Sequence, residues 1–180
     1  MRIFDYIGFC ILCLHFLPSR IRGFCASFLF KQCGSIKIEQ NVKIRGFNNI
    51  EIGNNVTIQK NTHIDARGGY IYLADWFNAF PETTIIAQYG KLITGTHFST
   101  ARNVDIYCSC GEISTGKNFS LNQRSLLHAG NSKIVIGDDC LFGYDVKLFA
   151  GIHDHGTSDK LLCDAGMRYI PISIGNTPKR

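Results

Sequence analysis

Apolar residues recur along this chain at every twenty-first position. Three positions of the repeat are apolar in five consecutive rows. The first position holds Ile50, Ile71, Leu92, Ile113 and Ile134. The second holds Val56, Phe77, Phe98, Phe119 and Cys140, and the third holds Ile64, Ile85, Ile106, Leu127 and Leu148. Repetition at such a period is the signature of a solenoid, in which each turn buries its apolar side chains against the next turn.

Within one row, apolar residues stand six apart, as Ile52 and Ile58 do. Short apolar segments punctuated by Gly, Asn and Asp are typical of strands joined by tight turns. Six residues to a side and three sides to a turn predict a triangular parallel β-helix. Asn residues that follow the glycines, such as Asn55, suit the left-handed backbone of its corners. The segment 36–44 resembles 50–58, which predicts a first turn much shorter than the turns that follow.

The repeat is interrupted after His153. In earlier rows the same corner position holds Gly69, Gly90, Gly111 and Ser132. The apolar pattern resumes at Ile172, and Gly175 follows Gly137 by nearly twice the regular interval. We therefore expect a loop at 154–170 to leave the helix directly after a corner histidine. Insertions at solenoid corners often form the binding face, so this interruption is the strongest site signal in the chain.

Residues 1–34 are expected to be helical, with a break near Pro18 and an end at Gly34. The apolar run at 6–17 is too short to cross a bilayer, which needs about 20 residues. One interpretation is a cap over the open first turn, because the terminal repeats of a solenoid need one. The other is an interfacial helix whose basic residues face lipid phosphates, and these residues are Arg20, Arg22 and Lys31. The two interpretations are compatible.

The net charge of +5 comes from scattered Lys and Arg residues in a chain of 180 residues. With no basic run and no nucleic-acid motif, this charge indicates mild attraction to anionic partners and no nucleic-acid binding. The eight cysteines form no disulfide framework, and Cys10 and Cys13 lack the second pair that a zinc site requires. We expect a reduced, cytoplasmic chain, with peripheral contact at the inner membrane if the interfacial interpretation holds.

The IxIGxN and IxIGDD units over 36–175 resemble the hexapeptide-repeat acyltransferases, and most of all the maltose, serine and surface-polysaccharide O-acetyltransferases. The resemblance implies an all-β, left-handed parallel β-helix that forms homotrimers and binds acyl-CoA between neighbouring subunits. On this basis the chain divides into a helical cap at 1–35, the β-helix at 36–175 with its loop at 154–170, and a polar tail at 176–180. It implies acetyl-CoA as the acyl donor and requires no metal.

The same resemblance assigns roles within LFAGIHDHGTSD. It places His153 on the family's general base, with Asp154 beside it to orient the imidazole. An imidazole titrates near neutrality, so it can take the proton of a sugar hydroxyl as the oxygen attacks a thioester. His155 is the second choice of base and a candidate contact to substrate. Asn122 resembles an asparagine that helps to hold the acceptor in sugar acetyltransferases.

The resemblance predicts an O-acetyltransferase that acts on a saccharide in surface-polysaccharide synthesis, and the apolar, basic N-terminus suits an acceptor carried on a membrane lipid. In the family, the segment that matches 170–175 leads into further turns that shape the donor groove, whereas here it leads into 176–180. A truncated, non-catalytic assembly or scaffold protein is therefore the alternative. A third class with this fold, the γ-type carbonic anhydrases, binds metal through three histidines, and metal analysis of the purified protein would test it.

Overall fold

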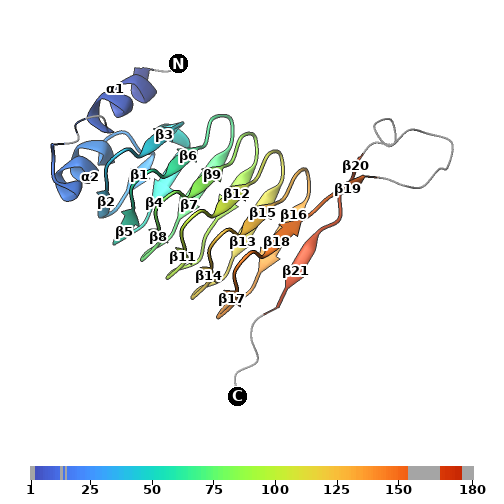
Figure 1. Ribbon diagram of the computed structural model, residues 1–180. Helices are drawn as coiled ribbons and strands as arrows, with labels where there is room; N and C mark the ends of the chain where they lie inside the picture. Colours follow the sequence, from blue (N-terminus) through green and yellow to red (C-terminus); the bar gives the residue numbers. More distant parts are fainter. Residues whose placement is uncertain (1–2, 13, 15, 154–166, 176–180) are drawn as a thin grey trace.

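The computed structural model describes residues 3–12, 14, 16–153 and 167–175. These residues form an all-β parallel solenoid of about 6 turns, preceded by two short helices (Figure 1). The helices are α1 (Ile3–Leu12) and α2 (Ser19–Ser27), and a 3-10 turn, η1, spans Phe47–Asn49. The fold class predicted from the regular spacing of apolar residues is confirmed.

The strands form three parallel sheets, one for each side of the solenoid. Sheet A contains β1 (Gln32–Cys33), β4 (Ile50–Ile52), β7 (Tyr70–Leu73), β10 (Lys91–Ile93), β13 (Glu112–Thr115), β16 (Lys133–Ile136) and β21 (Ile172–Ile174). Sheet B contains β2 (Ile36–Ile38), β5 (Val56–Ile58), β8 (Asn78–Ala79), β11 (Ser99–Thr100), β14 (Ser120–Leu121) and β17 (Leu141–Phe142). Sheet C contains β3 (Lys43–Arg45), β6 (His63–Asp65), β9 (Thr84–Ile86), β12 (Asp105–Tyr107), β15 (Leu126–His128) and β18 (Lys147–Phe149).

The three apolar columns of the sequence point into the solenoid. Their members are buried, except for Leu148 in the last turn of sheet C, which is half-buried. Phenylalanines stack along one inner edge, with ring centroids 5.2 Å apart from Phe77 to Phe98 and 4.8 Å apart from Phe98 to Phe119. Each turn thus contributes side chains to one continuous core, which no single turn could form alone.

The prediction of a much shorter first turn is wrong. Ile36 pairs with Val56, and Lys43 pairs with His63, so the first turn is nearly as long as the later ones. The error arose because strands on different sides of the prism have the same IxI pattern. The segment at 36–38 lies on sheet B, whereas the similar segment at 50–52 lies on sheet A. Sequence similarity between two strands does not show that they are neighbours in a sheet.

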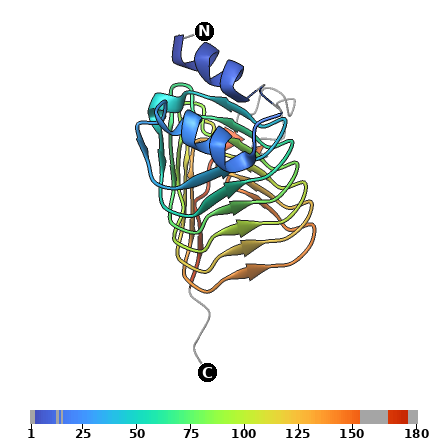
Figure 2. The same cartoon turned by 90° about the vertical axis from the view of Figure 1, so that its left-hand side faces the viewer.

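The two N-terminal helices cover the first turn, as the end-on view shows (Figure 2). Leu12, Ala26 and Phe30 are buried against the solenoid, and the rings of Phe30 and Phe47 lie 5.0 Å apart. The break near Pro18 is confirmed. The predicted end at Gly34 is too late, because Gln32–Cys33 already belong to sheet A. No described helix is both long and apolar enough to cross a membrane.

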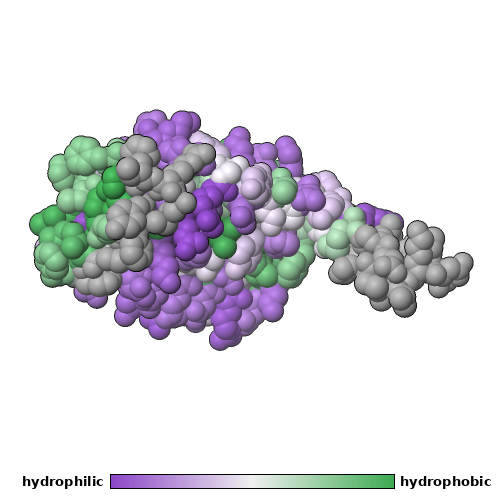
Figure 3. Space-filling view, turned by 90° about the horizontal axis from the view of Figure 1, so that it is seen from above, coloured by the Kyte–Doolittle hydropathy of each residue, from purple (hydrophilic) through white to green (hydrophobic). Residues whose placement is uncertain are grey.

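Arg22 does not face a lipid surface, so that part of the interfacial interpretation is wrong. It is 1% exposed, and its guanidinium donates to the carbonyls of Ile38, at 3.0 Å, and Leu17, at 2.9 Å. Lys31 is exposed but pairs with Glu51 at 2.6 Å. Exposed apolar side chains still gather over the helical end (Figure 3). They include Ile7, Phe16, Ile21, Phe24 and Phe28.

Candidate functional site

The chain leaves the solenoid slightly before the predicted point, because the sequence predicts a loop directly after His153, whereas Ile152 and His153 already belong to a pair of strands outside the three sheets. After β18 the chain enters β19 (Ile152–His153), which pairs antiparallel with β20 (Met167–Arg168) instead of joining a solenoid sheet. The backbone then returns to sheet A, where Ile172 pairs with Ile134. The two strands form a ribbon that projects from the solenoid (Figure 1). His153, opposite Met167, lies in this ribbon, where the chain leaves the regular repeat.

Tyr169 supports the base of the ribbon, and sequence reasoning missed it. A Cβ atom built on Gly130 would lie 3.0 Å from the Tyr169 ring, and one built on Gly151 would lie 3.1 Å from it. The Tyr169 ring therefore packs directly against the backbone of Gly130 and Gly151, where a side chain would crowd it. Beside it, the Ile170 amide donates to the Ala150 carbonyl at 3.2 Å. An aromatic residue directly before the pattern resumes was the signal that could have identified it.

The other predicted site residues lie apart from His153 or beyond the described part of the chain. Asp154, His155, most of the 154–170 loop and the 176–180 tail are outside the described residues. Asn122 follows sheet B, whereas His153 follows sheet C. The Asn122 amide donates to the Phe142 carbonyl of the next turn at 3.0 Å. Within one chain, its structural role is therefore to join two neighbouring turns.

The remaining described histidines belong to regular turns. His128 lies between Tyr107 and Phe149 in an outward column, with ring centroids 6.1 Å and 5.9 Å away. Burial lowers the pKa of His63, and the nearby Asp65 offsets this only in part. Among the described residues, no group of three or more His, Cys, Asp or Glu side chains is placed to hold a metal ion.

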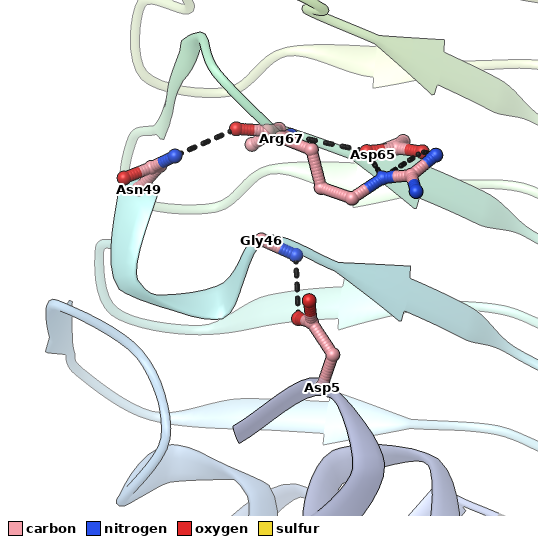
Figure 4. Close-up of polar contacts among 6 residues, drawn as sticks. Asp5, Gly46, Asn49, Asp65 and Arg67 are labelled. Atoms are coloured by element: carbon pink, nitrogen blue, oxygen red, sulfur yellow. Dashed lines mark hydrogen bonds and ion pairs between the residues drawn. The ribbon is translucent and has the colours of Figure 1, made fainter. Parts of the chain in front are cut away.

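A polar cluster fixes the corner after β6 (Figure 4). Arg67 donates from Nε to Oδ1 of Asp65 at 3.0 Å and from its terminal nitrogen to Oδ2 at 2.8 Å. Burial acts to raise the pKa of Asp65, but these hydrogen bonds outweigh it and hold that pKa below its usual value. Asn49 donates to the Ala66 carbonyl at 2.9 Å. With both carboxylate oxygens engaged, Asp65 serves the fold and is not a free base.

The cluster also lies beside the N-terminal cap. In the same view, Oδ1 of Asp5 accepts a hydrogen bond from the Gly46 amide at 2.7 Å (Figure 4). Asp5 is buried, so this bond satisfies a carboxylate that would otherwise be costly to remove from water. Together with the Arg22 bonds to the Ile38 carbonyl, it attaches the cap to the first turn by polar contacts from both helices.

A groove of about 740 Å³ lies between α2 and the outer face of sheet B. Its walls include Trp76 and His97, whose rings are parallel within 4° with centroids 5.8 Å apart. The two residues occupy one corner column, whose other members are Asn55, Asn118 and Asp139, and all five have positive φ. Neither Trp76 nor His97 is among the site residues predicted from the sequence. The available signal was the replacement of Asn or Asp by two aromatic rings in consecutive rows.

Comparisons of the chain with protein-family models, with curated proteins and with solved structures found no match.

Proposed function

We propose that this chain is an O-acetyltransferase that moves an acetyl group from acetyl-CoA to a saccharide hydroxyl in surface-polysaccharide synthesis. One observation carries the proposal: a regular hexapeptide-type β-helix is interrupted after β18, and the ribbon that leaves it there carries His153. Loops and insertions on a rigid scaffold carry function more often than its regular turns do. The repeat units and the LFAGIHDHGTSD segment resemble acyltransferases that carry out this reaction.

In this proposal His153 is the general base. Its neutral imidazole takes the proton of the saccharide hydroxyl while the oxygen attacks the thioester carbonyl. The carbon–sulfur bond then breaks, and the departing thiolate receives the proton from the imidazolium. Asp154, the next residue, would orient the imidazole. His155 and Asn122 are proposed contacts to the acceptor, and no residue is assigned to the donor.

The proposal includes partners. A homotrimer would place the donor between neighbouring subunits and bring Asn122 of one subunit toward the loop of another. The exposed Phe16, Phe24 and Phe28 support peripheral contact with the inner membrane on the cytoplasmic side, where a lipid-linked acceptor would be met. Sedimentation velocity tests the trimer, and a monomer at working concentration would overturn that part.

The deciding experiment measures acceptor-dependent release of the CoA thiol with a panel of saccharides, and the mass of the acetylated product. His153→Ala should lower kcat/KM by about 10²–10⁴-fold, the usual contribution of a general base. His128→Ala is the matched control, because that histidine lies in a regular turn of sheet C, and it should leave the rate unchanged. His155→Ala separates the two candidate bases.

Two results would overturn the proposal. If no saccharide stimulates thiol release, the chain is better explained as the non-catalytic scaffold. If transfer occurs but His153→Ala and His128→Ala have equal rates, the assignment of His153 is wrong.

A further inference from the structure

We propose that the groove between α2 and sheet B is a binding site for an acidic oligosaccharide. The floor of the groove is a row of polar side chains, one from each of four consecutive turns. Its members are in direct register along sheet B, and they are Lys37, Thr57, Asn78 and Ser99. Neighbouring strands lie about 4.8 Å apart, so the row presents hydrogen-bonding groups over roughly 14 Å.

A row of this kind suits a linear ligand with repeating hydroxyls. The Asn78 carbonyl oxygen accepts from Gln59 Nε2 at 3.2 Å, which leaves the Asn78 amide nitrogen to donate elsewhere. Ser99 shares a hydrogen bond with Ser120, the next residue of the same column, at 3.0 Å. Hydroxyl and amide groups at regular intervals can bond successive sugar units, whereas a compact ligand would use only one or two of them.

Trp76 and His97 form the aromatic wall of the groove. Trp76 is 54% exposed, although a tryptophan is a costly residue to leave in water. Its backbone has φ of 63°, and that of His97 has φ of 57°, a region that Asn or Asp tolerates better than a bulky residue does. The C–H faces of pyranose rings pack well against such aromatic surfaces.

The spacing of the two rings argues against a nucleobase. Their centroids are 5.8 Å apart and their planes nearly parallel, so a third ring has no room between them. A sugar needs no such insertion, because its C–H face can pack against the outer face of one ring while its hydroxyls reach the polar floor. The spacing therefore excludes a nucleobase inserted between the two rings, and the repeating polar floor favours a saccharide.

The charge of the groove selects an acidic saccharide. Arg20 on α2 and Lys37 on β2 are both exposed, and none of the described residues that line the groove is acidic. Carboxylates on a sugar chain would find two cations at the end nearest the helical cap. This inference does not rest on acetyl transfer, because the groove lies on sheet B and His153 follows sheet C.

The chain carries its own probe for the test, because Trp76 is its single tryptophan. Titration of the full chain with trigalacturonate should change the tryptophan emission in a saturable way. The uncharged methyl ester of the same trisaccharide should bind about three- to tenfold more weakly, as expected for loss of exposed ion pairs. Uridine monophosphate should bind more weakly than either. Arg20→Met with Lys37→Met should abolish the preference for the acidic form.

Calorimetry extends the test to variants without the tryptophan. Trp76→Asn introduces the residue type found in its own column at Asn55 and Asn118, so folding is preserved. It should weaken trigalacturonate binding about three- to tenfold. Tyr89→Asn is the matched control, because Tyr89 is an exposed aromatic residue with positive φ outside the groove, and it should bind normally.

The inference is overturned if trigalacturonate does not bind, if Trp76→Asn and Tyr89→Asn bind it equally well, or if the nucleotide binds more tightly. Saccharide binding without acetyl transfer would support the groove and count against the proposed catalytic function. Acetyl transfer together with unchanged saccharide binding by Trp76→Asn would support the proposed catalytic function and count against the groove.

Discussion

The groove on sheet B and the ribbon at His153 are built in opposite ways. In the groove the register of the repeat is intact, and only the side chains in the outward and corner columns differ from row to row. At His153 the backbone leaves the register and forms an antiparallel pair. A solenoid can therefore gain a site by substitution within its columns or by insertion between its turns. The first leaves the spacing of the sequence unchanged, whereas the second interrupts it.

The two regions also differ in how their residues are held. Trp76 and His97 stand in adjacent turns whose pairing with neighbours on both sides fixes their separation. His153 stands on a two-residue strand with one partner strand, supported by the Tyr169 ring over Gly151. We expect the groove to be rigid and the ribbon to depend on local contacts. Variants that each weaken the contacts of one region should therefore affect the groove and the ribbon differently.

The variant with the largest expected effect removes a side chain from the core that supports both regions. Phe98 is fully buried between Phe77 and Phe119, so Phe98→Ala should lower the free energy of unfolding by about 3–5 kcal/mol. Urea denaturation followed by circular dichroism measures this loss. Phe24→Ala serves as the control, because Phe24 is 65% exposed and should change stability by no more than about 0.5 kcal/mol. Equal effects of the two variants would contradict the common core.

A second variant should have a smaller effect on stability, and its local effect should be confined to the groove. Arg22 holds α2 to the first turn through the Ile38 and Leu17 carbonyls, so Arg22→Ala should cost about 2–3 kcal/mol. Hydrogen exchange should increase at α2 and β2 but not at β16 or β18. Arg102→Ala, at an exposed corner, is the control and should leave exchange unaltered. If protection fell equally along the solenoid, the cap would be supporting every turn and the contrast between the regions would fail.

The double variant Trp76→Asn/His97→Asn should raise the free energy of unfolding. Left-handed backbone costs roughly 1–2 kcal/mol for residues other than Gly, Asn and Asp, and the variant relieves this at two corners. It loses one exposed ring stack, worth about 0.5–1.5 kcal/mol, so the net gain should be about 2 kcal/mol. The urea midpoint measures it. A clear loss of stability would show that the rings serve the fold and not a ligand.

The smallest effect is a pH response of the turns themselves. Because burial lowers the pKa of His63, the unfolded chain binds the proton first as pH falls below about 6.5. Stability should decrease there and level off once the folded chain is also protonated. The lowered pKa of Asp65 should add a second loss below about pH 4. In His63→Thr, which copies Thr84 of the next strand, urea midpoints between pH 8 and pH 5 should lack the first decrease.

Spacing along the sequence was enough to predict the core columns, the corners and the approximate position of the interruption. Each follows from counting, because the side chains of one column stack in consecutive turns. Spacing could not show which side of the prism a strand joins, and this produced the wrong length for the first turn. It also could not show that Arg22 turns inward to the Ile38 carbonyl, since that bond joins a helix to a strand. The Trp76–His97 pair escaped notice because its rows keep the period.

The glycine corner limits where this fold can vary. A Cβ on Gly69 would overlap the Ala87 carbonyl, and one on Gly90 would overlap that of Cys108, each in the next turn. Stacked turns therefore leave no room for a side chain at Gly69 or Gly90, whereas His153, the last member of this column in the sequence, lies in the ribbon and not at a stacked corner. A histidine in place of Gly90 would collide with the backbone of the next turn, so mutation can introduce a histidine into this column only where the chain has left the stack.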